Sequence, residues 1–235
     1  MNKLTVENLS KTFQSGEEQI EVFNIKKFSI SESETVAIKG ASGSGKSTFL
    51  QIMAGLDSPT NGHVFLSGSI SKEISGNEIS DIHSLKEKQL NKLRKNNFGF
   101  IYQKNFLLKD LSVLDNLLIV NGDEEKAFSL LEEVGLKDKA NRYHNQLSGG
   151  EKQRVSICRA LMNNPSFVFA DEPTGALDYH TKEKIWDLFK KMQEKYNFGL
   201  IMVTHDNDMA KKCENNYTFK EGDIKKLKKK ERNNK

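Results

Sequence analysis

The clearest pattern along the chain is a set of short, uninterrupted apolar runs. They occupy residues 35–38, 98–102, 167–170 and 200–203 and are rich in β-branched and aromatic side chains. Runs of this length that do not alternate with polar residues are typical of strands buried on both faces of a sheet. The last two end directly in polar residues, as strands do in open α/β sheets that carry chemistry at their carboxyl ends. We therefore predict an α/β fold.

Helical spacing appears between these runs. After Lys46, apolar residues recur every three or four positions until Gly55, which favours a helix stop. Residues 182–196 have the length and pattern of a helix between two of the predicted strands. A right-handed crossover through this helix would join the two strands in parallel.

The middle of the chain has a more helical character. Apolar positions within residues 114–136 repeat at helical spacing and end at Gly135. A further helix is expected after Ser148, because glycines and a polar N-cap precede an apolar run there. We therefore predict a mainly helical insertion over residues of about 104–160.

Two further segments have patterns of their own. Residues 1 to about 32 contain short alternating stretches at 4–6 and 20–23, which suit an antiparallel sheet. Residues 67–85 are rich in Ser, Gly, Asn and Asp and show little periodicity. We interpret this second segment as surface loops.

Residues 40–47 read Gly-Ala-Ser-Gly-Ser-Gly-Lys-Ser, a complete G-x-x-x-x-G-K-[ST] phosphate loop. The loop lies between a predicted strand and a predicted helix, where backbone N–H groups and the helix N-terminus can bind phosphates. We expect Lys46 to place its charge on the β- and γ-phosphates and the Ser47 hydroxyl to bind Mg²⁺. The predicted nucleotide-binding residues here are Gly40, Ala41, Ser42, Gly43, Ser44, Gly45, Lys46, Ser47 and Thr48.

A second glycine-rich motif, Leu-Ser-Gly-Gly-Glu, occupies residues 147–151 and is called the signature below. Ser148, Gly149 and Gly150 offer a hydroxyl, two unobstructed N–H groups and a helix start, which together make another anion site. We interpret the signature as a lid for the nucleotide held by a second copy of the chain. A symmetric homodimer with two ATP molecules at its interface is the simplest such arrangement.

Acidic and polar residues follow the remaining strands. Asp171 and Glu172 end the run 167–170, where Asp171 can hold Mg²⁺ and Glu172 can contact the water that attacks the γ-phosphorus. His205 follows the run 200–203, within reach of the γ-phosphate as a hydrogen-bond donor. Gln103 closes the run 98–102, and its amide can touch Mg²⁺ or the attacking water. We predict Glu172, His205 and Gln103 as catalytic residues, and Ser47, Gln103 and Asp171 as metal ligands.

The composition of the chain limits the classes of protein to which it can belong. The chain of 235 residues suits one domain, and no window approaches the roughly 18 apolar residues of a membrane helix, so we expect a cytoplasmic protein. Cys158 and Cys213 have no His or Cys neighbours at ligand spacing and are interpreted as packed or surface thiols. The net charge of +4 comes from residues 225–235, which hold seven Lys or Arg and one Glu.

This basic tail has two open interpretations. A disordered, solvated end is typical of such a segment, and attraction to anionic lipid headgroups is the alternative. Nucleic-acid binding is not expected, because no aromatic residue interleaves the charges. The remaining residues, 1–224, form the predicted nucleotide-binding domain.

These motifs, in this order, resemble those of the ATP-binding cassette (ABC) transporter ATPases over essentially the whole chain. The resemblance implies a P-loop NTPase fold with a RecA-like core, an N-terminal antiparallel β-subdomain and an inserted α-helical subdomain. It also implies ATP hydrolysis with Mg²⁺ by a subunit that docks on separate membrane proteins. Asp178, in the Gly-Ala-Leu-Asp loop 175–178, would couple the two sites across the dimer. Phe13 would stack on adenine, where Tyr is more usual.

Within that family the chain is most similar to the lipoprotein-releasing ATPases, through Gly-Phe-Ile-Tyr-Gln at 99–103 and Ala-Leu-Met-Asn-Asn-Pro at 160–165. This resemblance implies lipoprotein release at the cytoplasmic face of a bacterial inner membrane. Ala176 looks more like macrolide or antimicrobial-peptide exporters, and a cell-division cassette is a further alternative. Segment 104–119 is where contact with a membrane partner is implied, although core packing of its apolar residues is an equal reading. DNA-repair and translation cassettes are disfavoured because their coiled coil, zinc cysteines or second cassette are absent from the sequence.

Overall fold

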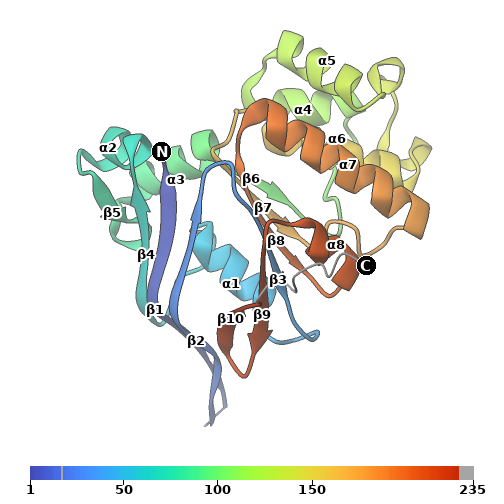
Figure 1. Ribbon diagram of the computed structural model, residues 1–235. Coiled ribbons are helices and arrows are strands. Elements are labelled where there is room, and N and C mark those ends of the chain that lie inside the picture. The colour runs from blue at the N-terminus through green and yellow to red at the C-terminus, as the bar shows by residue number, and fades with distance from the viewer. Residues whose placement is uncertain (17, 228–235) are drawn as a thin grey trace, which may run out of the picture.

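The computed structural model describes residues 1–16 and 18–227 and contains two β-sheets with helices around them (Figure 1). The larger sheet has six strands in the order β10-β9-β3-β8-β7-β6. Its strands are β3 Thr35–Lys39, β6 Phe98–Ile101, β7 Phe167–Asp171, β8 Gly199–Thr204, β9 Asn215–Lys220 and β10 Asp223–Lys226. All neighbours pair in parallel except β9 and β10. The four predicted apolar runs are therefore strands of one sheet.

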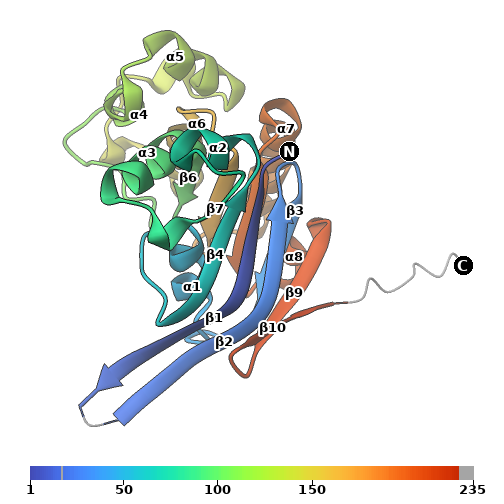
Figure 2. The ribbon, with the colours of Figure 1, turned by 90° about the vertical axis from the view of Figure 1, so that its left-hand side faces the viewer.

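The smaller sheet is antiparallel, in the order β2-β1-β4-β5, which agrees with the prediction for the N-terminal segment. Its strands are β1 Lys3–Ser15, β2 Glu18–Ser31, β4 Asn61–Ser67 and β5 Ile79–Asp81. β1 and β2 form a long hairpin that reaches beyond the rest of the molecule (Figure 2). The hairpin is apolar toward the core near its base and exposed toward its tip, where Phe13 and Ile20 pair.

Helix α1, Lys46–Met53, fills the space between the two sheets (Figure 1). Its buried Phe49, Leu50, Ile52 and Met53 join one apolar cluster with residues of both sheets. Phe49 makes edge-to-face contacts with Phe23 and Phe28 of β2, at ring centroid distances of 5.9 and 5.6 Å. Because α1 directly follows the phosphate loop, this packing fixes the loop against both sheets.

A second apolar cluster covers the opposite face of the six-stranded sheet. It is formed by helices α4 Val113–Asn121, α5 Glu124–Glu133, α6 Gly149–Leu161, α7 Tyr179–Tyr196 and α8 Asn207–Lys212. The predicted crossover helix begins at Tyr179, three residues earlier than expected, because Asp178 caps it. The stretch 114–136, for which helical spacing was predicted, forms two helices separated by Gly122 at φ +76° and by the N-cap Asp123.

The prediction of surface loops for residues 67–85 is wrong. This segment contains α2 Ser69–Ser75, β5 and a 3₁₀ turn at Ile82–Ser84, followed by α3 Glu87–Asn97. Ile70, Ile74 and Ile82 are buried in the core between the sheets. The Asn2 side chain accepts a hydrogen bond from the Ile70 N–H at 2.9 Å, so a residue far away in sequence holds the start of α2.

Both cysteines are buried: Cys158 packs in α6, with its thiol 3.5 Å from the Leu130 carbonyl, and Cys213 follows α8. Strand β10 includes Lys225 and Lys226, which the sequence analysis assigned to the basic tail. Residues 228–235 of that tail lie outside the described residues. In the part of the chain that the structure describes, no helix combines the length and apolar character needed to span a bilayer.

Candidate active site

The phosphate loop follows β3 and leads directly into α1. Gly45, the N-cap of α1, has φ +96°, and a Cβ there would lie 2.6 Å from Val22 Cγ1. Glycine is therefore required both by the backbone conformation and by the close passage of β2. The Phe49 N–H bonds the Gly45 carbonyl, which leaves the first N–H groups of α1 available to an anion.

Lys46 is buried, and its ammonium donates to the carbonyl oxygens of Gly40 at 3.0 Å and Ala41 at 2.7 Å. These bonds hold the charge within the loop itself. Three predicted features of a phosphate site thus come together here: a helix N-terminus, flexible glycines and a lysine ammonium. The neighbouring residues Ser42 and Gly43 are exposed and accessible to a ligand.

Phe13 lies on the β1–β2 hairpin, on the strand next to the one that contacts Gly45. The residue is 47% exposed, and the Lys11 ammonium lies 4.9 Å from the ring centroid. Lys11 is held in turn by Asp57 at 3.0 Å. An exposed aromatic face near the phosphate loop is suitable for stacking a base.

Two of the predicted metal ligands, Ser47 in the first turn of α1 and Asp171 at the end of β7, are in direct contact. The Ser47 hydroxyl donates to Asp171 Oδ1 at 2.9 Å. Burial raises the pKa of Asp171 above its ordinary value and the charge of Glu172 adds to this, while Ser47 and Lys46 oppose it. A cation bound between these two oxygens would offset the cost of the buried carboxylate.

Glu172 follows β7 with φ +48°, a left-handed conformation that is unusual for a residue other than glycine. Its Oε1 accepts from the N–H of His205 at 3.0 Å and lies 2.9 Å from His205 Nδ1. Its Oε2 accepts from the Thr204 hydroxyl at 3.2 Å. The carboxylate is therefore oriented by the end of β8, and the His205 ring is paired with Glu172 while its side chain remains 61% exposed.

Gln103 comes two residues after β6, at the same edge of the sheet. A Cβ on Gly175 would lie 2.8 Å from its side-chain nitrogen, so the amide rests against the turn that follows Glu172. The carboxyl ends of three adjacent parallel strands, β6, β7 and β8, thus bring Gln103, Asp171, Glu172 and His205 to one edge. The phosphate loop enters the same edge from β3.

The signature forms the start of α6, as predicted. Ser148 is the N-cap, and a reciprocal pair of bonds with Glu151 closes the first turn: the Glu151 N–H donates to Ser148 Oγ and the Ser148 N–H donates to Glu151 Oε2. The hydrogen bond from Lys139 and then the bonds from Ser148 lower the pKa of Glu151 to about 2. The helix start is thus held rigidly and keeps Gly149 exposed.

Gly150 packs against the first turn of α7. A Cβ at Gly150 would lie 2.7 Å from Thr181 Cγ2, so any larger residue would force α6, α7 or Thr181 to shift. Asp178 caps α7 through the N–H and hydroxyl of Thr181, at 3.1 and 2.6 Å. Asp178, which the sequence analysis assigned to coupling the two sites, therefore contacts Thr181, and Thr181 in turn packs against Gly150 of the signature in the same chain.

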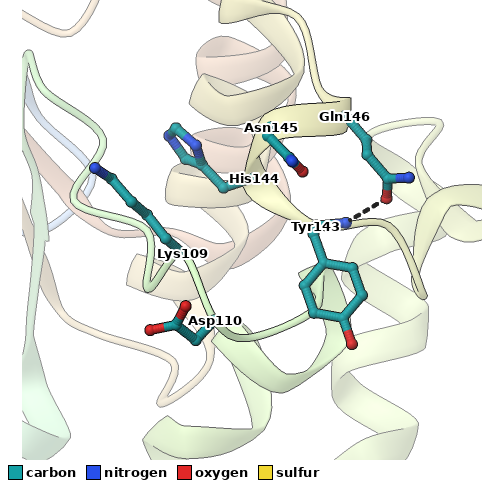
Figure 3. A pocket seen from close by; sticks show the side chains of 6 residues that line it. All are labelled: Lys109, Asp110, Tyr143, His144, Asn145 and Gln146. Carbon is teal, nitrogen blue, oxygen red and sulfur yellow. Dashed lines mark hydrogen bonds between the residues drawn. The ribbon is translucent and has the colours of Figure 1, made fainter.

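A cavity of about 580 Å³ lies beside the signature, lined by residues 109–110 and 143–146 (Figure 3). Burial and then the positive charges of Lys152 and Lys109 lower the pKa of His144 from its ordinary value.

Of the apolar residues after Gln103, Leu107 is buried in the helical cluster, whereas Phe106 and Leu108 are exposed. Segment 104–119 thus divides between core packing and an exposed apolar surface.

Sequence reasoning missed three residues that orient the site. Thr204 bonds Glu172, and Asp206 forms an ion pair with Lys182 of α7 at 2.9 Å. The last residue of a strand is a signal that could have identified Thr204. The pair between Lys182 and Asp206 depends on a tertiary contact, and nothing in the local sequence indicates it.

The comparisons with known proteins agree with this geometry. A family model described as "ABC transporter" matches residues 23–175. The chain belongs to the ABC transporter family. It is an ABC-type ATPase with the predicted P-loop NTPase fold, and its nucleotide is ATP.

Two similar proteins carry the name lipoprotein-releasing system ATP-binding protein LolD. The one from Treponema denticola is 39% identical over 227 residues, which cover 93% of this chain and 96% of that protein. The one from Coxiella burnetii is 40% identical over 217 residues, 88% of each. Among solved structures, a dimeric post-hydrolysis state of the ATP-binding cassette MJ0796 bound to ADP and Pi has a TM-score of 0.81. It is 36% identical and is matched over 96% of this chain and 99% of its own.

Proposed function

We propose that this ABC ATPase is the energy-coupling subunit of a lipoprotein-releasing complex, working as a homodimer on separate membrane subunits. The proposed ATP hydrolysis is supported by two neighbouring contacts beside the phosphate loop: Ser47 with Asp171, and Glu172 with His205. The lipoprotein assignment is supported by similarity to the LolD proteins over nearly the whole chain. The complex would place this chain at the cytoplasmic face of a bacterial inner membrane.

In this proposal Glu172 is the general base that orients and deprotonates the attacking water. Its carboxylate is already fixed by Thr204 and His205, so little reorganisation precedes the reaction. Because Nδ1 of His205 faces Glu172, its Nε2 is the ring nitrogen left to bond a γ-phosphate oxygen. Gln103 would orient the water from the opposite side of the Gly175 turn, and Lys46 would neutralise the phosphates.

The chemistry of the donor set fits Mg²⁺. Ser47 and Asp171 offer hard oxygen ligands 2.9 Å apart, and Gln103 offers an amide oxygen at the same strand edge. Mg²⁺ is usually bound through a few protein oxygens and completes its shell with substrate phosphates and water, which fits this donor set. When bound, Mg²⁺ would neutralise charge that develops on the β- and γ-phosphates.

The homodimer is supported by the exposure of Ser148 and Gly149 in the signature and by the dimeric MJ0796 cassettes, which match this chain with TM-scores of 0.81. Ser148, Gly149 and Gly150 would bind the γ-phosphate of the nucleotide held by the partner copy. Asp178 would lie between the two sites, and the exposed Phe13 would hold the adenine. Each pocket is therefore complete only when two copies meet.

The hydrolytic roles are tested with Glu172→Gln. The glutamine keeps one oxygen to accept from His205 but cannot take a proton, so we expect turnover to fall by about 10²–10⁴-fold, as for loss of a general base. ATP affinity should remain, and size-exclusion chromatography should show an ATP-dependent dimer. Hydrolysis near the wild-type rate would remove Glu172 from its proposed role, and a monomer at saturating ATP would remove the sandwich.

The cargo is tested separately, in the native cell. With the chain depleted or replaced by Glu172→Gln, lipoproteins should accumulate in the inner membrane, measured by fractionating the membranes. Normal lipoprotein sorting together with increased macrolide or peptide sensitivity would replace lipoprotein release with drug or peptide export. Normal sorting with a cell-separation defect would instead support a division-linked complex.

A further inference from the structure

Segment 204–209, which carries His205, is held by an ion pair from a different helix. Lys182 Nζ of α7 donates to Asp206 Oδ2 at 2.9 Å, and the two side chains are each only 20% exposed. Burial alone would raise the pKa of Asp206, but the hydrogen bond from Lys182 and the N–H groups of Met209 and Asp208 hold it below its ordinary value. The contact is therefore a charged pair in a partly dry environment, where its geometry is well defined.

Asp206 uses its two oxygens for different purposes. Oδ1 accepts from the N–H groups of Asp208 and Met209 and caps α8, while Oδ2 faces Lys182. The Asp206 N–H in turn donates to the Thr204 hydroxyl oxygen at 3.0 Å, and that hydroxyl bonds Glu172. A displacement of Asp206 would therefore shift Thr204 and His205, the two residues that orient the Glu172 carboxylate.

The anchor on the other side is rigid. Lys182 sits one turn into α7, whose start is capped by Asp178 and pressed against Gly150 through Thr181. α7 itself is an 18-residue helix with buried Ile185, Phe189 and Met192 in the helical cluster. The pair thus ties a short turn at the end of β8 to a long helix whose inner face is buried.

We infer that Lys182 is a positioning residue for ATP hydrolysis: through Asp206 it holds His205 and Thr204 in the arrangement that orients Glu172. This inference rests on the proposed roles of Glu172 and His205. Lys182 touches neither of these two side chains through any hydrogen bond or ion pair seen in the described residues. Its effect should consequently fall on the rate of the chemical step and leave nucleotide binding unchanged.

The experiment compares steady-state ATP hydrolysis by the full-length protein and its variants, normalised to folded protein by circular dichroism. Lys182→Met keeps the aliphatic chain and removes the charge; Asp206→Asn keeps the cap oxygen and removes the charge partner. We expect each to lower kcat by about fivefold, equivalent to about 1 kcal/mol, with KM for ATP changed by less than about twofold. Lys182→Arg should restore at least half of the wild-type kcat.

Two comparisons separate positioning from general destabilisation. The double variant Lys182→Met with Asp206→Asn should be no slower than either single variant, because both remove the same interaction. Lys211→Met is the matched control: it removes a similar pair, with Asp208 on α8. Both side chains are mostly exposed, and within the part of the chain that the structure describes they form no hydrogen bond or ion pair with residues 204–206. This control should hydrolyse ATP at the wild-type rate.

The inference is overturned if Lys182→Met keeps the wild-type kcat, if its loss appears in KM, or if Lys182→Arg is as slow as Lys182→Met. Multiplicative losses in the double variant would also overturn it. Glu172→Gln, assayed in parallel, identifies which proposal fails. If Glu172→Gln is inactive and Lys182→Met is normal, only the positioning role is lost; if Glu172→Gln is active, the proposed chemistry itself is wrong.

Discussion

The close packing of the signature against α7 makes Gly150→Ala a sharp test of the structure. Gly150 is buried, and the new methyl carbon would lie 2.7 Å from Thr181 Cγ2. The favourable distance between two carbon atoms is about 3.5–4.0 Å, so one of the helices must move by about 1 Å. Thr181 cannot simply rotate away, because it is β-branched and its hydroxyl donates to Asp178 at 2.6 Å.

The expected cost follows from two opposing effects. Overpacking a tight contact costs about 1–3 kcal/mol, whereas replacing glycine by alanine in a helix recovers up to about 1 kcal/mol. We therefore expect Gly150→Ala to lower the free energy of unfolding by up to about 2 kcal/mol, which shifts the melting temperature by about 2–4 °C per kcal/mol at this chain length. Urea titration followed by circular dichroism measures the change.

Two further variants make the result specific. Gly149→Ala places its methyl 3.5 Å from Leu177 Cδ2, an ordinary contact, and should be neutral or slightly stabilising. Thr181→Ser removes Cγ2 but keeps the hydroxyl that binds Asp178, so it should relieve most of the cost of Gly150→Ala in the double variant. If Gly150→Ala is as stable as Gly149→Ala, or if Thr181→Ser gives no relief, the contact between α6 and α7 is not as described.

Two other predictions concern the nucleotide site. Because burial raises the folded-state pKa of Asp171, the ionised carboxylate lowers the stability of the folded protein at pH values above the ordinary pKa of 3.8. The variant Asp171→Asn can still accept the hydrogen bond from Ser47 and carries no charge, so it should raise the melting temperature near pH 7. This gain should shrink as the pH falls toward 4, where Asp171 itself becomes protonated. A gain that is constant with pH would argue against the buried carboxylate. Phe13→Ala should raise KM for ATP by about 5- to 100-fold, as expected for a lost stacking platform, while Phe13→Tyr should match the wild type. Equal KM values for Phe13→Ala and wild type would place the adenine elsewhere.

Much of the architecture follows from local pattern. The apolar runs predicted the central strands, because strands buried on both faces need no alternation, and their polar ends predicted where the site lies. The two glycine motifs predicted where α1 and α6 begin, because their glycines and polar N-cap favour the backbone conformations found at helix starts. The break at Gly122 and Asp123 also carried a local signal, a glycine followed by a capping aspartate.

The segment around α2 shows what local pattern misses. Its polar composition predicted loops, yet Ile70 and Ile74 are buried and Asn2 binds the first turn. A helix of seven residues has too few turns for periodicity to identify it, and the side chain that binds its first turn, Asn2, lies 68 residues away in the chain. The orientation of Glu172 is non-local in the same way, because its partners Thr204 and His205 lie more than 30 residues away in the chain.

The burial of both cysteines has a practical consequence for studying the two-copy assembly. Maleimides and similar reagents react with the thiolate, and burial raises the pKa of Cys213 to about 12 and that of Cys158 further still. The native thiols should therefore stay unlabelled in the folded protein. A single cysteine introduced at an exposed position such as Leu108 would then carry a spin label or fluorophore selectively, so that distances between two copies could be followed through the ATP cycle in an otherwise natural sequence.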